Sequence, residues 1–139
     1  KAFTEAESYD GPSLIMAYAP CINHGIKKGM GKTQEETDLA VKSGYWPLYR
    51  YRPSVEEHEH PFQLDSAAPT IPLREFALKE ARYSMLARSD PERSAMLLAL
   101  AQDEIDERWR YYEQLAGVER TLHEPHVIDV TDEPEDADA

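Results

Sequence analysis

The apolar stretch LIMAYA at residues 14–19 decides the fold prediction, because its side chains do not alternate between apolar and polar. Such a run is typical of a strand covered on both faces, as in a parallel sheet between helices. Lys1–Tyr9 before it has helical spacing. Asp10-Gly11-Pro12 ends that helix, since glycine suits the position after a helix and proline cannot continue one. A helix, a tight turn and a covered strand predict an α/β fold, with the chain opening inside an α/β unit.

The length and composition are those of a single globular domain. The chain has 139 residues, of which 41 % are hydrophobic and 30 % charged. Its longest apolar run, Leu14–Pro20, is much shorter than the roughly 20 residues that span a bilayer, so we expect no transmembrane helix. Lys1–Asp10 is charged and does not resemble a signal peptide. The lone Cys21 excludes an internal disulfide and any multi-cysteine metal site built from this chain alone.

The net charge of −12 is concentrated at the C-terminal end. Residues 118–139 hold eight of the 27 acidic residues, against Arg120 as their only base. This composition predicts a solvated, mobile tail, in which Val127–Val130 is a small apolar patch suited to docking as a short strand on another domain or subunit. An acidic protein is a poor general binder of nucleic acid, which requires a basic surface.

The segment Gly11–Gln34 differs from the rest of the chain because it contains no acidic residue. It carries Lys27, Lys28 and Lys32 in a glycine-rich loop that follows the predicted strand. This local positive charge is the first indication of a functional site.

A helix is predicted from Thr33 to Lys42 or Ser43. Thr33 and Glu36 have the spacing of a capping box, and Gly44 provides a stop. Its last turns carry apolar residues suited to a buried side.

Two short extended segments are predicted next. Trp46–Arg52 reads as a strand with tyrosines on one side and arginines on the other, and Phe62–Ser66 as a short extended piece. Alternating tyrosine and arginine also resembles a stacking surface for single-stranded nucleic acid. A strand with one packed and one ion-paired side is the simpler interpretation.

Two helices are predicted in the second half. Leu73–Arg88 reads as one helix whose apolar residues spread over more than one stripe, as in a helix contacted on two sides. Pro91–Ala116 has a regular apolar stripe, a capping residue in Asp90 and a terminator in Gly117.

Two near-miss motifs are better explained structurally. Gly31-Lys32-Thr33 resembles the end of a phosphate-binding loop, but Ile26 stands where that motif requires its first glycine. His58-Glu59-His60 offers imidazoles, yet neighbouring residues in an extended loop seldom aim both rings at one ion. Other histidines that could join a metal site are His24, His123 and His126.

Cys21 is the strongest single candidate for a functional residue. It directly follows the predicted covered strand, and open α/β sheets build their sites at the carboxyl ends of strands. Backbone N–H groups and lysines in the following loop would stabilise a thiolate or an anionic iron–sulfur cluster. A lone cysteine is otherwise most often a small buried apolar residue.

Three ordered blocks of the sequence resemble pyruvate:ferredoxin oxidoreductase (pyruvate synthase). The resemblance covers about residues 1–117 and leaves out the acidic tail. The matching blocks are AYAPCINHGI at 17–26 with GMGK at 29–32, AVKSGYWPLYRY at 40–51, and PFQLDS at 61–66.

The resemblance implies that the chain is the C-terminal portion of a much larger enzyme. Residues 1–66 would be the end of a thiamine-diphosphate-binding α/β domain, with a parallel sheet and flanking helices. Residues 67–117 would form C-terminal helices, and residues 118–139 the acidic tail. The Gly-Asp-Gly motif that holds magnesium and diphosphate in this family would precede residue 1.

The resemblance also implies a function. The family oxidatively decarboxylates pyruvate to acetyl-CoA and CO2 on thiamine diphosphate with Mg²⁺, and passes electrons through [4Fe–4S] clusters to ferredoxin or flavodoxin. Cys21 matches the fourth ligand of the cluster nearest the thiamine, whose three other cysteines lie far upstream. The expected assembly is a cytoplasmic homodimer of the full-length enzyme, and this segment alone is expected to be inactive. The competing interpretation is a non-catalytic acidic interaction module.

Overall fold

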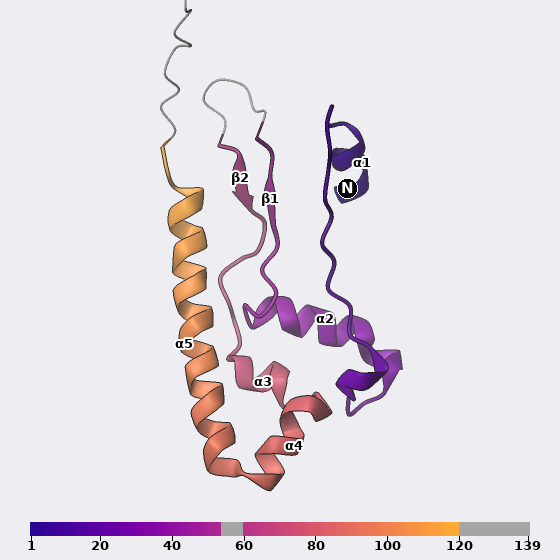
Figure 1. Ribbon diagram of the computed structural model, residues 1–139, viewed down its shortest axis with the longest axis vertical. Helices are drawn as coiled ribbons and strands as arrows, with labels where there is room; N and C mark the ends of the chain where they lie inside the picture. Colours follow the sequence, from indigo (N-terminus) through magenta and orange to yellow (C-terminus); the bar gives the residue numbers. More distant parts are fainter. Residues whose placement is uncertain (54–59, 120–139) are drawn as a thin grey trace, which may run out of the picture.

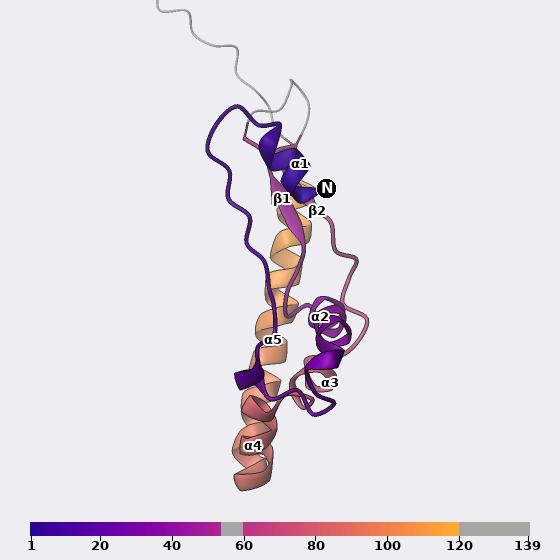
Figure 2. The same cartoon turned by 90° about the vertical axis from the view of Figure 1, so that its right-hand side faces the viewer.

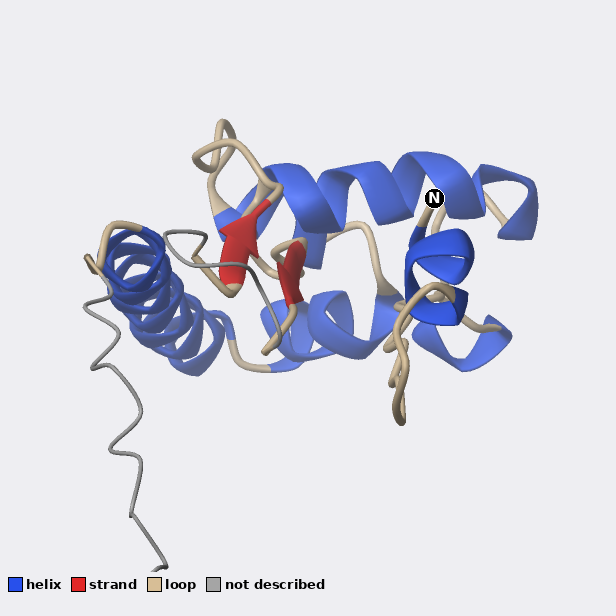
Figure 3. Ribbon diagram, turned by 90° about the horizontal axis from the view of Figure 1, so that it is seen from above, coloured by secondary structure: helices blue, strands red, loops and turns tan. Residues whose placement is uncertain are grey.

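The computed structural model describes residues 1–53 and 60–119. The elements follow one another as α1 (Ala2–Glu7), the 3-10 turns η1 (Ile22–His24) and η2 (Met30–Lys32), α2 (Thr33–Lys42), β1 (Tyr49–Tyr51), β2 (Phe62–Leu64), α3 (Leu73–Ala77), α4 (Ala81–Ser89) and α5 (Pro91–Ala116). Figure 1 shows α5 along one side of the molecule, with the two strands beside one half of it and α3 and α4 toward the other end. From above, the strands lie between α5 and the N-terminal helix (Figure 3).

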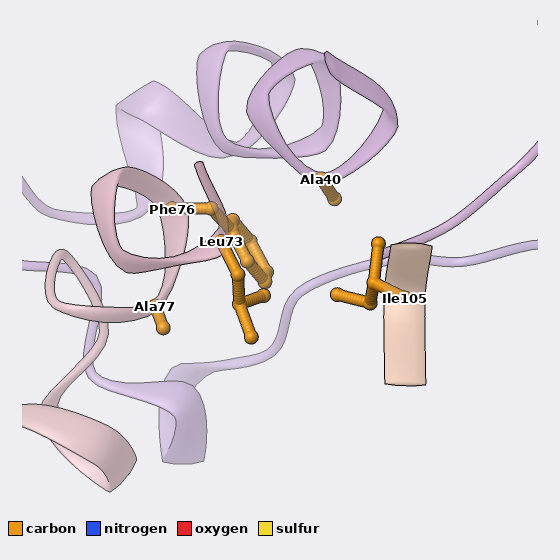
Figure 4. Packing of buried hydrophobic residues seen from close by; sticks show 5 residues of the cluster. All are labelled: Ala40, Leu73, Phe76, Ala77 and Ile105. Atoms are coloured by element: carbon orange, nitrogen blue, oxygen red, sulfur yellow. The ribbon is translucent and has the colours of Figure 1, made fainter. Parts of the chain in front are cut away.

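The core lies where α2, α3 and α5 meet. Its buried side chains come from all three helices (Figure 4), and they are Ala40, Leu73, Phe76, Ala77 and Ile105. Phe76 is completely buried and packs against the ring of Tyr45, with centroids 4.8 Å apart. The small side chain of Ala40 permits the close approach of α2 to this cluster. Apolar burial at this junction therefore fixes the lower half of the molecule.

Arg108 joins α5 to the end of α2. Its guanidinium donates hydrogen bonds to the carbonyl oxygens of Gly44 and Tyr45, at 3.0 and 3.1 Å. Gly44 ends α2 with a left-handed φ of 73°, as predicted. A cation at this point satisfies carbonyl groups beyond the helix end and complements the negative end of the helix dipole.

The two strands form an antiparallel pair, with Arg50 opposite Gln63. The ring of Tyr49 packs on Phe62 and Tyr112, each with centroids 5.4 Å away. On the other side, Arg50 donates to Asp65 and to Glu5 of α1, each at 2.7 Å. Tyr49 and Arg50 thus agree with a strand that has one packed and one ion-paired side, whereas Tyr51 is 64 % exposed and does not.

The structure corrects the prediction of a covered strand at residues 14–19. The segment is irregular and has no strand partner within the described part of the chain (Figures 1 and 2). Leu14 is 84 % exposed and Met16 63 % exposed. The described strands form a two-stranded antiparallel sheet rather than the predicted parallel one. A run of this kind becomes a covered strand only when neighbouring strands supply its hydrogen bonds and helices cover its faces.

One helix prediction and one capping-box prediction also need correction, whereas the predicted bounds of α2 and α5 are confirmed. Leu73–Arg88 is two helices, because the segment between α3 and α4 turns to form a bridge from Glu80 to Ile26. The capping box at the start of α2 is absent: the Thr33 hydroxyl instead donates to the Met30 carbonyl at 2.6 Å. Helix α5 has the predicted bounds.

The predicted cap of α5 is present as well. The Arg93 N–H donates to Asp90 Oδ1 at 3.0 Å, and Pro91 occupies the first turn. Within the residues that the structure places, we find no helix with both the length and the apolarity required to span a membrane.

Candidate functional site

Cys21 stands at the start of a tight turn, with an exposed and unbridged side chain. Its carbonyl accepts the His24 N–H at 3.0 Å, and its own N–H donates to His24 Nδ1 at 3.3 Å. These two hydrogen bonds join the carbonyl and the N–H of Cys21 to His24, and they close the 3-10 turn η1. The turn therefore holds the cysteine backbone while leaving its sulfur accessible.

The loop after Cys21 is held against the chain between α3 and α4. We call Lys79-Glu80-Ala81 the anchor segment. Its Ala81 N–H donates to the Gly25 carbonyl at 2.9 Å, and the Lys27 N–H donates to the Lys79 carbonyl at 3.0 Å. Gly25 has a left-handed φ of 63°, and a Cβ there would lie only 2.4 Å from the Ala81 Cβ. Two segments more than 50 positions apart in the sequence are thus in direct contact.

The carboxylate of Glu80 is completely buried beneath this turn. It accepts a hydrogen bond from the Tyr18 hydroxyl at 3.3 Å and pairs with the Arg82 guanidinium. Burial and the neighbouring Glu80 carboxylate raise the pKa of Tyr18, so its hydroxyl remains a donor at neutral pH. The Tyr18 and His24 rings are nearly parallel, at an interplanar angle of 14°.

His24 stands between Cys21 and Glu80. Its Nδ1 lies 3.6 Å from Glu80 Oε1 as well as within reach of the Cys21 N–H. An unprotonated Nδ1 accepts from the cysteine backbone, whereas a protonated one pairs with the carboxylate. The imidazole can make one of these interactions at a time.

A second carboxylate, Glu36 of α2, is buried near Glu80. Its Oε1 has no hydrogen-bond partner among the described residues. Burial, together with the charge of Glu80, raises the pKa of Glu36. Both effects disfavour the ionised form of this side chain.

The lysines of the acid-free loop line a cavity of about 120 Å³, together with Lys79, Ile26 and two glutamates of α2. Lys28 and Lys32 pair with Glu35, at 3.0 and 3.4 Å. The charge of two loop lysines is therefore offset by a neighbouring helix, which the loop sequence by itself did not indicate.

Within residues 1–53 and 60–119, the alternative sites are not assembled. Lys32 pairs with Glu35 and Thr33 begins α2, which agrees with a glycine-rich loop leading into a helix. His60 Nδ1 is within hydrogen-bond distance of the Phe62 backbone. Outside the described residues lie His58, Glu59, His123, His126 and the patch Val127–Val130. Among the residues that the structure places, no three His, Cys, Asp or Glu side chains are grouped to hold a metal ion.

The donor set fits one corner of an iron–sulfur cluster and no more. Such clusters are held by cysteine thiolates, and Cys21 is the only cysteine of the chain. Its exposure leaves the sulfur open to an iron that other thiolates also bind. The sequence located this cysteine in a loop, but it did not reveal Glu80 or Tyr18. The one available signal was a carboxylate at Glu80 within a broadly apolar helical pattern.

Comparison with known proteins extends over most of the chain. No protein-family model matches it. The chain is 50 % identical over 117 residues to pyruvate:ferredoxin oxidoreductase of Moorella thermoacetica, and 46 % identical over 118 residues to pyruvate-flavodoxin oxidoreductase of Nostoc. It is 44 % identical over 116 residues to mitochondrial pyruvate dehydrogenase [NADP(+)] of Euglena gracilis.

These matches cover 83–84 % of the chain but only 10 %, 10 % and 6 % of the three relatives. Identity of this degree over more than 100 residues establishes common ancestry and a shared local fold. The chain is therefore a homologue of the pyruvate:ferredoxin and pyruvate-flavodoxin oxidoreductases, corresponding to about a tenth of their length.

Proposed function

We propose that this chain is the C-terminal portion of a 2-oxoacid:ferredoxin oxidoreductase that acts on pyruvate, and that Cys21 provides one thiolate to its thiamine-proximal [4Fe–4S] cluster. The observation that carries the proposal is an exposed thiol on a turn closed by two hydrogen bonds, in a chain that is 50 % identical over 117 residues to a pyruvate:ferredoxin oxidoreductase. Cysteine thiolate is the ligand that these clusters use.

The complete enzyme would convert pyruvate and coenzyme A to acetyl-CoA and CO2, with ferredoxin or flavodoxin as electron acceptor. Bound thiamine diphosphate supplies carbanion stabilisation, and the clusters supply one-electron carriers. Residues outside this chain would hold the thiamine diphosphate, its Mg²⁺ and the three other thiolates. The full-length enzyme would be a cytoplasmic homodimer.

Within this division of labour, the chain's own residues bind and orient. The Cys21 side chain is exposed at the start of the η1 turn, and the anchor segment holds the loop that follows it. Lys27 lies six residues after Cys21 in the sequence and lines the cavity beside α2, where it adds positive charge to the loop. Lys28 and Lys32 contribute less, because Glu35 is already paired with both.

Exposed apolar side chains in the segment that carries Cys21 support contact with other parts of the same protein. Leu14, Met16 and Ile22 are 84, 63 and 77 % exposed. Large apolar side chains left exposed along one segment are candidates for an interface. We assign this surface to the domains that would supply the remaining cluster ligands.

The test is Cys21→Ser in the full-length enzyme, with Asn23→Ser as the matched control. Asn23 is exposed in the same turn and receives the same new side chain. We expect Cys21→Ser to lower the iron content by about one cluster, roughly four irons, and to remove one cluster signal from the EPR spectrum. The control should retain both. Unchanged iron and EPR in Cys21→Ser would refute the ligand role and favour the non-catalytic acidic module.

A further inference from the structure

We propose that Glu80 is a positioning residue for Cys21, holding in place the turn that presents the thiol. This inference rests on the proposed ligand role of Cys21. Glu80 is a single buried residue that is linked to both sides of the cysteine. Its side chain contacts the chain before Cys21, and the backbone of its neighbours contacts the chain after Cys21.

Before the cysteine, the contact is made by side chains. The Tyr18 hydroxyl, three residues upstream of Cys21, donates to Glu80 Oε1 at 3.3 Å. A carboxylate acceptor makes this a charge-assisted hydrogen bond, which is roughly twice as strong as a neutral one. It fixes the end of a segment whose preceding residues have no strand partner within the described chain.

After the cysteine, the contact is made by the backbone. Residues on both sides of Glu80 bond to the loop: Ala81 N–H to the Gly25 carbonyl, and Lys79 carbonyl to the Lys27 N–H. Together they form the bridge between Ile26 and Glu80. The anchor segment therefore holds the loop three residues before Cys21 and four to six residues after it.

The burial of Glu80 makes a purely space-filling role a poor explanation. A fully buried carboxylate carries a large desolvation penalty, which an apolar residue of similar size would avoid. The penalty is offset because Arg82 and Tyr18 both bond to this carboxylate. Glu36 is also buried and lines a cavity with Ile26 and Lys27, but its Oε1 has no hydrogen-bond partner among the described residues. It therefore provides the matched control.

The experiment compares Glu80→Gln with Glu36→Gln in the full-length enzyme. Backbone amide exchange over residues 18–27 reports how firmly the loop is held, whether or not a cluster is present. The EPR line shape and the midpoint potential report the geometry around the iron. Replacing a charge-assisted interaction by a neutral one should make loop opening about tenfold more frequent in Glu80→Gln. Its cluster signal should shift while the iron content stays the same.

Glu36→Gln should change loop exchange, EPR line shape and potential less than Glu80→Gln does, because Glu36 Oε1 has no hydrogen-bond partner among the described residues. Tyr18→Phe removes only the hydroxyl, so it should shift exchange and EPR in the same direction but by less. This variant keeps the inference testable if Glu80→Gln does not fold. Suppose that Cys21→Ser removes the cluster, so that the ligand role holds. Wild-type amide exchange and a wild-type EPR spectrum in Glu80→Gln or in Tyr18→Phe would then overturn only the positioning role of Glu80. Cluster retention in Cys21→Ser would instead overturn the proposed function, even if Glu80→Gln still loosens the loop.

Discussion

Three glycines in the loop after Cys21 separate two reasons why alanine at Gly25 should destabilise the loop. These are the backbone conformation and the steric contact with Ala81. Gly31 has neither a left-handed φ nor an atom within 4 Å of an added Cβ. Gly29 has a φ of 81° with no atom in that range, and Gly25 has both a φ of 63° and the Ala81 Cβ at 2.4 Å. Substitution of each by alanine adds the same methyl group in three different situations.

The structure sets the expected order of the three effects. Gly31→Ala should change local stability by less than about 1 kcal/mol, and in the stabilising direction, because alanine restricts the unfolded chain. Gly29→Ala should cost about 1–3 kcal/mol, because its φ of 81° and ψ of 168° lie in a region that essentially only glycine adopts. Gly25→Ala should cost about 2–4 kcal/mol, because the clash also displaces Ala81 and weakens its 2.9 Å hydrogen bond to the Gly25 carbonyl.

The assay is backbone amide exchange over residues 21–32 and 79–83 in the full-length enzyme. At about 1.4 kcal/mol per factor of ten, Gly25→Ala should exchange roughly 30- to 1000-fold faster than wild type near the anchor segment. Adding Ala81→Gly removes the clashing methyl group and should return the double variant to about 1–2 kcal/mol, the cost of the left-handed backbone alone. An effect of Gly25→Ala that Ala81→Gly does not relieve would refute the close approach of the loop to the anchor segment.

Two other buried side chains give independent predictions. Burial and the charge of Glu80 raise the pKa of Glu36 in the folded state. The contribution of Glu36 to the free energy of unfolding is therefore fully present below its unfolded pKa of about 4.3, and it is lost as the pH rises through the higher folded value. Glu36→Gln lacks that loss, so protection of α2 amides in the variant should exceed wild type by a margin that grows with pH; a margin that is constant or shrinks contradicts the assignment. Phe76→Ala should cost about 3–5 kcal/mol in the local stability of α3, measured by amide exchange, because the ring is completely buried. Phe3→Ala, at an 80 % exposed position, is its control, and equal effects of the two would argue against the described core.

The elements that the sequence predicted best depend on local signals. Helix α5 begins and ends where Asp90, Pro91 and Gly117 indicate, because capping and termination act within a few residues. Gly44 ends α2 for the same reason. The position of Cys21 in a loop also followed from neighbouring residues.

The elements that the sequence missed depend on distant contacts. The break between α3 and α4 arises where Glu80 pairs with Ile26, more than 50 residues away, and helical spacing carries no trace of that partner. Residues 14–19 have the composition of a covered strand, but in the described chain no neighbouring strand supplies the hydrogen bonds that such a strand requires. The contacts that hold the Cys21 loop were missed for the same reason, since Tyr18 and Glu80 lie 62 positions apart in the sequence.

The Arg108 contact has a consequence for how the helical junction responds to acidity. A guanidinium stays charged at every pH that a protein experiences, and its two acceptors here are backbone carbonyls, which do not titrate. The attachment that this contact makes between α5 and the end of α2 is therefore insensitive to protons.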